Sequence, residues 1–110
     1  MHFQLKDQNI LIYQDKECTS EFLESFNAHY AEFQSYNIIF LAAESQASTP
    51  VFLDTLIKLI KAHQHHKKSF VVVSAHWISN ELPEELVCVP TLQEAIDLIE
   101  MDEMQRDLGF

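Results

Sequence analysis

The fold is decided by a stretch in the middle of the chain, residues 38–73, which reads IIFLAAESQASTPVFLDTLIKLIKAHQHHKKSFVVV. It begins and ends with runs that are apolar at every position, and such strands belong to the covered centre of a sheet, usually a parallel one. Between the runs, Thr49 and Pro50 have the residue types of a helix N-cap and first position. An apolar stripe follows at helical spacing: Leu53, Leu56, Ile57 and Ile60. The stretch predicts a parallel β-α-β unit.

Towards the N-terminus, apolar and polar residues alternate over residues 2–6 and 9–14. This period of two predicts a pair of short strands joined at Asp7 and Gln8. A helix is expected to begin near Thr19 or Ser20, which are good capping residues. One face of this helix carries Phe22, Phe26, His29 and Phe33.

Towards the C-terminus, we expect a short segment around residues 76–78, a third parallel strand at Leu86–Val89 and a last helix after Pro90. Thr91 and Glu94 have the spacing of a capping box, in which each satisfies a free backbone N–H of the first turn. The element order predicts an α/β fold in a single domain, residues 1–110. Its sheet is expected to be mixed, mostly parallel and four- to five-stranded, with an N-terminal strand pair and helices packed against it.

Composition excludes several classes of function. The 110 residues include 17 acidic and 7 basic side chains, which gives a formal net charge of −10. Nucleic-acid affinity comes chiefly from Lys and Arg, so we expect no binding to DNA or RNA. Gly109 is the single glycine, which excludes the glycine-rich loops that cradle phosphates, and no cofactor is expected.

The apolar runs are strand-sized, much shorter than the roughly 20 residues that span a bilayer, so no membrane association is expected. The first residues, MHFQLKD, lack the basic and apolar regions of a signal peptide. Cys18 and Cys88 have no CxxC spacing, and Cys88 is expected to be a small buried hydrophobe. We therefore expect a cytoplasmic protein.

Five features occur in a characteristic order: the N-terminal strand pair, the apolar strand Asn37–Ala43, the capped helix Thr49–Ala62, the Val-rich strand Phe70–Ser74 and the junction Val89–Ala95. Together they resemble the STAS domain, the fold of bacterial anti-sigma-factor antagonists. The resemblance implies a module that interacts with proteins. Short chains with a similar ending, down to residues 106–110, are sometimes labelled ribonuclease Z, but the residues here do not support that activity.

The chain departs from the STAS pattern at the start of the second helix. Signalling STAS domains carry Asp-Ser-(Ser/Thr)-Gly there, and a partner kinase phosphorylates the Ser. Residues 46–51 read QASTPV, so the Asp and the Gly are missing while Ser48 and Thr49 keep their hydroxyls. These two residues are candidates for a phosphoacceptor or anion site at a helix N-terminus, and plain capping is the alternative.

In open α/β sheets, ligands bind beyond the carboxyl ends of the strands. The loops Glu44–Thr49 and Ala75–Ser79 are both expected to leave from that end. A candidate ligand crevice is therefore formed by Glu44, Ser45, His76 and Trp77, beside Ser48 and Thr49. The alternative is that Trp77 closes the core and His76 has no role.

Three imidazoles, His63, His65 and His66, precede Lys67 and Lys68. Such a tract binds Zn²⁺ or Ni²⁺ adventitiously, but a hydrolytic metal site normally needs a carboxylate and an open position as well. We expect no metal centre and interpret the tract as a solvated helix end whose cations complement the helix dipole.

The last helix continues beyond its core stripe of Leu92, Ile96 and Ile99. Six acidic residues lie in it, together with further apolar residues towards the end of the chain: Met101, Met104, Leu108 and Phe110. Met-rich surfaces beside charge are typical of partner contacts. One hypothesis is that this segment docks a protein partner. The basic tract of a second copy (Lys58, Lys61, Lys67 and Lys68) is one such partner, which would give a homodimer. The other is that the tail folds back on its own sheet.

Three functions remain. The first is a non-catalytic, regulatory protein-interaction module of the STAS type, whose partner the sequence does not identify. The second is a small-ligand-binding domain that uses the crevice at the carboxyl ends of the strands. The third, an enzyme such as a minimal hydrolase or an accessory subunit of a nuclease, is disfavoured because no set of nucleophile, base and orienting residue can be assembled.

Overall fold

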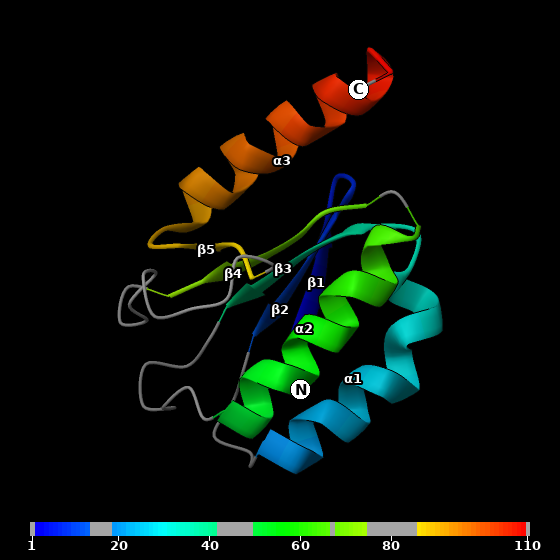
Figure 1. The fold of residues 1–110 in the computed structure, drawn as a ribbon, viewed down its shortest axis with the longest axis vertical. Coiled ribbons are helices and arrows are strands. Elements are labelled where there is room, and N and C mark those ends of the chain that lie inside the picture. Colours follow the sequence, from blue (N-terminus) through cyan, green and yellow to red (C-terminus); the bar gives the residue numbers. More distant parts are fainter. Residues whose placement is uncertain (1, 14–18, 42–49, 67, 75–85, 110) are drawn as a thin grey trace.

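The computed structural model describes residues 2–13, 19–41, 50–66, 68–74 and 86–109, and Figure 1 shows their arrangement. The strands are β1 (His2–Lys6), β2 (Asn9–Tyr13), β3 (Asn37–Leu41), β4 (Phe70–Val73) and β5 (Cys88–Val89). The helices are α1 (Thr19–Phe33), α2 (Pro50–Gln64) and α3 (Leu92–Asp107). The chain thus alternates strands and helices as the hydrophobic pattern predicts.

The five strands form one mixed sheet in the order β1-β2-β3-β4-β5. β1 pairs antiparallel with β2, and each later strand pairs in parallel with the one before it. Asp7 and Gln8 connect β1 to β2, with Asp7 at a φ of 58°. A positive φ at the first central residue suits the tight, right-twisted connection of a two-residue hairpin. The predicted strand pair and the mixed, mostly parallel sheet are confirmed.

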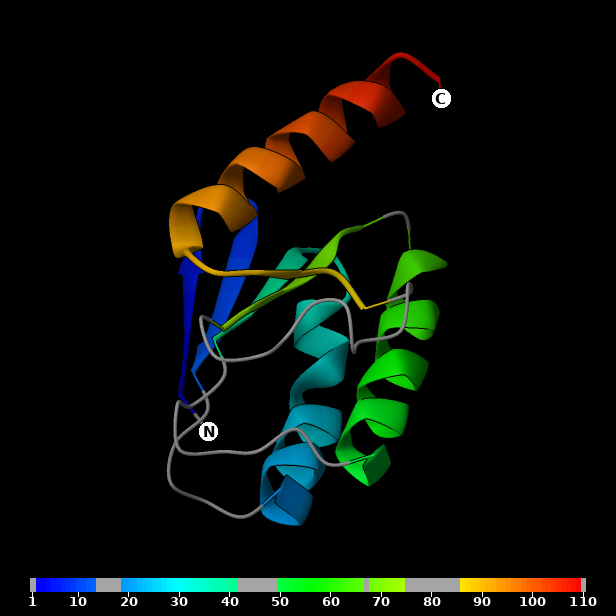
Figure 2. The same cartoon turned by 60° about the vertical axis from the view of Figure 1, so that its left-hand side comes forward.

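Helices cover both faces of the sheet (Figure 2): α1 and α2 lie on one face, and α3 lies on the other. The connections β2-α1-β3 and β3-α2-β4 cross the sheet in the same direction, so right-handed crossovers place both helices together. Ile38 and Phe40 of β3 pack towards α1 and α2, while Ile39 between them packs towards α3. Coverage on both sides explains why this strand is apolar at every position.

Capping and strand length agree with the sequence in most places. The backbone N–H of Glu94 donates to Thr91 Oγ1 at 3.2 Å, which confirms Thr91 as the N-cap of α3. Pro50 is the first residue of α2, as predicted. The third parallel strand is shorter than expected, although the N–H of Val72 still donates to the C=O of Val87 at 2.9 Å. The predicted segment at residues 76–78 lies outside the described residues.

Candidate functional site

The crevice expected at the carboxyl ends of the strands is not described by the structure. β3 ends at Leu41 and the neighbouring parallel β4 ends at Val73, so the carboxyl ends of both strands lie at the same end of the sheet. The side chains proposed for this crevice all lie outside the described residues: Glu44, Ser45, Ser48, Thr49, His76 and Trp77. They stay predictions.

The second expected surface, at the end of α3, lies almost entirely within the described residues. Met101, Met104 and Leu108 are 57%, 64% and 70% exposed. Their spacing of three and then four residues places them on one side of the helix. We call these three side chains the apolar face of α3. These three side chains therefore do not fold back on the sheet, although the same turns of α3 contact it, while Phe110 lies outside the described residues.

The opposite side of the same turns is anchored to the sheet through Asn37, which is fully buried at the start of β3. Its Nδ2 group donates to Glu103 Oε1 at 2.7 Å and to Asn9 Oδ1 at 3.2 Å. Its Oδ1 accepts from the backbone N–H of Ser69 at 2.9 Å. One amide side chain thus connects β2, β3, the residue before β4, and α3.

Ser69 extends this connection. Its hydroxyl donates to Asp102 Oδ2 at 3.0 Å and accepts from Nη1 and Nη2 of Arg106 at 3.3 and 3.4 Å. We call the whole set the Asn37 network: Asn9, Asn37, Ser69, Asp102, Glu103 and Arg106. Hydrogen bonds to charged groups stabilise by about 1.5–3 kcal/mol each, so the network fixes the rotation of α3 about its axis. That rotation is what turns the apolar face towards solvent.

Sequence reasoning did not find the Asn37 network. Asn37 and Ser69 stand directly before apolar runs and read as ordinary strand boundaries. Asp102 and Glu103 read as part of the solvated acidic surface of α3. Only the strand register, which aligns Ile38 with Phe70, shows that both strand starts lie together under the same helix.

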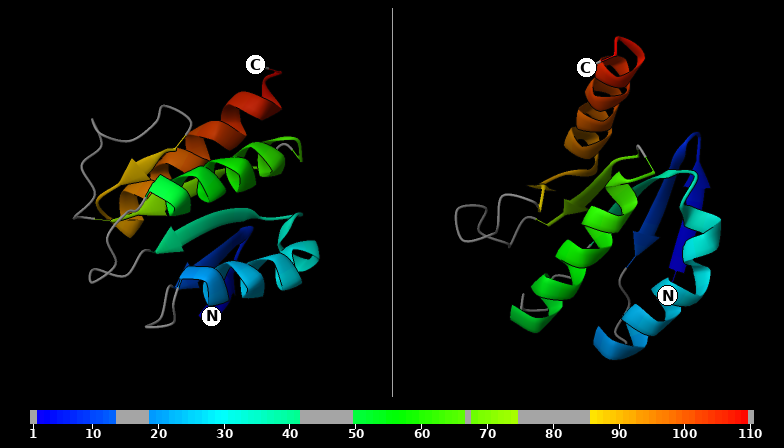
Figure 3. Two further views of the ribbon diagram at one scale, coloured as in Figure 1. Left: turned by 60° about the horizontal axis from the view of Figure 1, so that its bottom comes forward. Right: turned by 45° about the vertical axis from the view of Figure 1, so that its right-hand side comes forward.

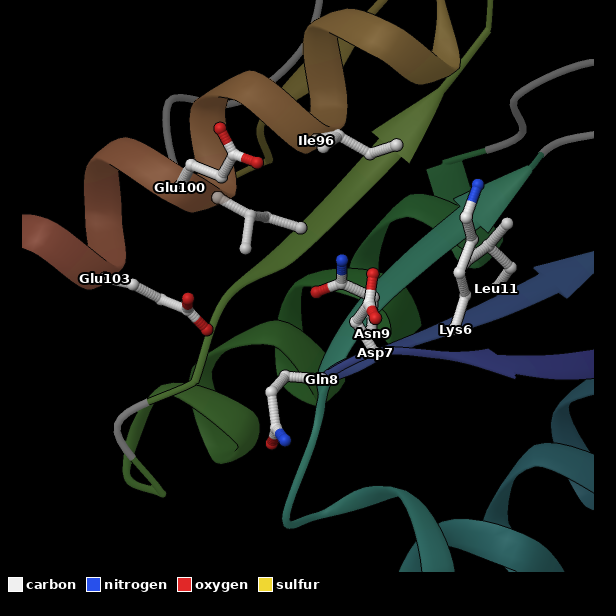
Figure 4. A pocket seen from close by; sticks show the side chains of 9 residues that line it. Lys6, Asp7, Gln8, Asn9, Leu11, Ile96, Glu100 and Glu103 are labelled. Carbon is white, nitrogen blue, oxygen red and sulfur yellow. The ribbon is translucent and has the colours of Figure 1, made fainter.

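A pocket of about 280 Å³ opens between the β1–β2 hairpin and α3. Figure 4 shows side chains of α3 facing those of the hairpin across it. The apolar part of its lining consists of Leu11, Ile96 and Ile99. Its polar part consists of Lys6, Asp7, Gln8, Asn9, Glu100 and Glu103. The pocket lies at the hairpin and the amino ends of the parallel strands. The crevice that the sequence suggested would lie at the opposite, carboxyl ends of these strands.

Three carboxylates and one ammonium group line this pocket, so its charge is predominantly negative. Glu103 is already bonded to Asn37, whereas Glu100 is exposed. A small pocket with an apolar floor and an acidic rim suits a short amine better than an anion.

His63 corrects the interpretation of the histidine tract as a solvated helix end, because its side chain is fully buried. Its Nε2–H donates to the C=O of Tyr36 at 2.8 Å, and its Nδ1 accepts from the hydroxyl of Tyr30 at 2.9 Å. Burial lowers the pKa of His63, and the charges of His66 and Lys68 act in the same direction against the Tyr36 hydrogen bond.

Both ring nitrogens of His63 are therefore occupied in the neutral form, and this imidazole is not free to bind a metal. His65 and His66 are exposed. No group of three or more His, Cys, Asp or Glu side chains is placed to hold a metal ion in the part of the chain that the structure describes. A spacing signal was present in the sequence, since His63 continues the stripe of Leu56 and Ile60 by one turn.

Cys88 is half-buried on β5 and packs against the core beneath α1 and α2. Burial raises the pKa of its thiol, against the opposing effect of a contact from Sγ to the C=O of Ser74 at 3.9 Å. A thiol that is protonated at neutral pH is a poor nucleophile.

The chain matches no protein-family model and no curated protein. Among residues 2–13, 19–41, 50–66, 68–74 and 86–109, none of the helices combines the length and hydrophobicity of a membrane span. Two described surfaces are candidates for function, the apolar face of α3 and the pocket beside it.

Proposed function

We propose that this protein is a non-catalytic, STAS-like interaction module that binds a protein partner through the apolar face of α3. The observation that carries the proposal is the exposure of Met101, Met104 and Leu108 on a helix whose other side is fixed by the Asn37 network. Contiguous exposed apolar side chains commonly mark interaction sites, and Met adapts its shape to different partners.

The charges around this face indicate the chemistry of the partner. Glu94 and Asp97 are exposed and lie on the same side of α3 as Met101, nearer its N-terminus. Glu100 and Asp107 flank the apolar face and are also exposed. A partner that presents an apolar patch bordered by Lys and Arg would complement this surface in both respects.

The proposal is tested by a pair of variants with equal added charge. Met101→Asp with Met104→Asp places two carboxylates in the apolar face, and we expect capture of the partner from native lysate to fall at least about ten-fold. Asn27→Asp with Gln34→Asp adds the same charge at exposed positions of α1 or just after it and should leave capture unchanged. The captured protein is then purified and its dissociation constant is measured with each variant.

Charge complementarity gives this test a second readout. Raising the ionic strength from about 0.05 to 0.5 M should weaken the complex, because exposed charges are screened over about 8 Å at physiological salt and less above it. A partner that binds both double variants with equal affinity would contradict the proposed surface.

A second candidate, small-ligand binding, is favoured by the pocket between the hairpin and α3. Ligand pockets usually enclose about 300–1,000 Å³, so this one admits only a small molecule. Short diamines are the probe, and the measurement is the shift of the unfolding midpoint. Stabilisation that disappears in Glu100→Gln would support this function. The absence of any shift with the intact protein would remove it.

A further inference from the structure

The two edges of the sheet differ in length and in protection. β5 and β1 lie at the two edges of the sheet (Figure 3). β5 has two residues, whereas β1 has five. Short edge strands, charged side chains such as Lys, prolines and bulges are the usual devices that prevent a sheet from pairing with another chain. β1 reads HFQLK and pairs residue by residue with β2, so it has neither a proline nor a bulge, and its one Lys is the last residue of the strand.

The outward-facing backbone groups of β1 follow from one hydrogen bond. The N–H of Asn37 donates to the C=O of Gln8, so the even-numbered residues of β2 direct their backbone groups towards β3. The odd-numbered residues of β2 face β1, and their register partners are His2, Gln4 and Lys6. The N–H and C=O groups of Phe3 and Leu5 therefore point away from the sheet.

The side chains of these two residues are also incompletely covered. Phe3 is 43% exposed, although its ring lies 5.0 Å from that of Phe33, and Leu5 is 52% exposed. Both lie on the α1 side of the sheet, because Phe3 contacts α1 and Leu5 is two residues further along the strand. Backbone groups that no described strand pairs with, and partly exposed apolar side chains, thus belong to the same two residues.

We infer that β1 pairs with β1 of a second copy, in antiparallel orientation, to form a homodimer with one continuous sheet. A two-fold axis through Gln4 is the register that pairs all five residues of both strands. It places Phe3 opposite Leu5 of the second copy on both sides of the axis. Those are the residues with outward N–H and C=O groups, so the register closes four backbone hydrogen bonds and covers four apolar side chains.

The distribution of charge favours this edge over other surfaces. Two copies that each carry a net charge of −10 repel one another, and the repulsion is weakest where carboxylates are absent. β1 contains no acidic residue, whereas α3 contains six. Screening by salt should therefore strengthen a β1 dimer. A dimer that paired α3 with the basic tract of a second copy would instead weaken.

A covalent trap tests the register directly. Directly opposed residues of a non-hydrogen-bonded antiparallel pair have Cα atoms about 4.5 Å apart, within the range of a disulfide. With Cys18 and Cys88 replaced by Ala, we expect Gln4→Cys to form a disulfide-linked dimer under mild oxidation. The matched control is Lys6→Cys, on the same face of the same strand. Its two copies would lie about four residues apart along the strand, roughly 13 Å, and should not cross-link.

Backbone pairing is tested by Leu5→Pro, which removes an N–H that β2 does not use. The hairpin should remain folded, as checked by circular dichroism, while dimer affinity falls at least about ten-fold in sedimentation equilibrium between about 10 and 500 µM. Leu5→Lys is the second variant; it keeps the N–H and places charge in the interface, and it should weaken the dimer as well. A five-residue edge is a small interface, and interfaces below about 1,200 Å² are typical of weak association.

Three results would overturn the inference. They are a monomer at every concentration and salt, cross-linking of Lys6→Cys as efficient as that of Gln4→Cys, and a dimer that survives Leu5→Pro but is lost in Met104→Asp. The last result would assign self-association to α3. Failure of the β1 dimer would leave the proposed partner surface on α3 untouched, since the two surfaces share no residue.

Discussion

The two faces of the sheet are covered by different means. On the α1 and α2 side, large side chains such as Phe26, Phe33 and Phe40 are fully buried and pack against one another. On the α3 side, the apolar core is smaller, and towards the end of the helix the hydrogen bonds of the Asn37 network connect α3 to the sheet. The α1 and α2 side stabilises the fold by packing of large side chains. On the α3 side, hydrogen bonds set the orientation of one helix.

This difference explains why the α3 side carries both candidate surfaces. In the described part of the chain, α3 alone lies on this face of five strands, and a pocket remains beside β1 and β2. A helix that is oriented by polar contacts also needs no apolar residues on its far side for stability. The exposed Met101 and Met104 are thus unexplained by packing, which is the reason to assign them to a partner.

The largest expected effect tests the packed face. Phe26 is 1% exposed, and its ring lies within 6.2 Å of the rings of Tyr30, Phe33 and Phe70. We expect Phe26→Ala to lower the free energy of unfolding by about 3–5 kcal/mol. Urea denaturation measures it, and Met104→Ala on the exposed face should change stability by less than about 0.5 kcal/mol. An equal loss of unfolding free energy in both variants would contradict the proposed difference between the packed face and the exposed face.

The next effect tests the hydrogen-bonded face. Asn37→Ala leaves the N–H of Ser69 and the carboxylate of Glu103 without their partner, and we expect a loss of about 2–3 kcal/mol. Amide hydrogen exchange should show α3 losing protection before β3 does, because β3 keeps its strand partners. If α3 exchanged no faster than in the intact protein, the network would not be what orients the helix.

His63 tests the packed face through pH. Its pKa is lowered from 6.5 in the folded state, chiefly by burial, so the unfolded chain binds the proton more tightly. Its contribution to stability is therefore present above pH 6.5 and is lost as the pH falls through the folded pKa. The free energy of unfolding should be lower at about pH 5.5 than at about pH 7.5, and this decrease should be smaller in His63→Gln. Identical decreases in the two proteins would assign the pH dependence to other groups.

The smallest effect concerns the start of α3. Thr91→Ala removes the acceptor for the N–H of Glu94, and a lost N-cap costs about 1 kcal/mol. Thr91→Ser keeps the hydroxyl and is the control in the same urea titration. A Ser variant as destabilised as the Ala variant would point to the Thr methyl group instead of the cap.

Much of the fold follows from local pattern in the sequence. The alternation around Asp7, the helix that buries Leu56 and Ile60, and the cap at Thr91 each depend on neighbouring residues, and all three are confirmed. The Asn37 network could not be predicted because it depends on strand register. The pairing of β3 with β4 brings Asn37 and Ser69 together, and both then contact α3, Asn37 through Glu103 and Ser69 through Asp102. His63 was misassigned for another reason, because its polar neighbours in the sequence outweighed its place on the stripe of Leu56 and Ile60.

The order of the strands has a consequence for how the chain folds. Every strand lies beside the one that precedes it, so each pairing closes a single connection and the entropy of loop closure stays low. Such near-neighbour contacts favour rapid folding and allow the sheet to grow from β1 towards β4 while the chain is still being synthesised. α3 emerges after all five strands, and until it docks, apolar residues such as Ile39 and Val71 on its side of the sheet are open to other chains. Docking of α3 is therefore the step that ends the period of greatest exposure to aggregation.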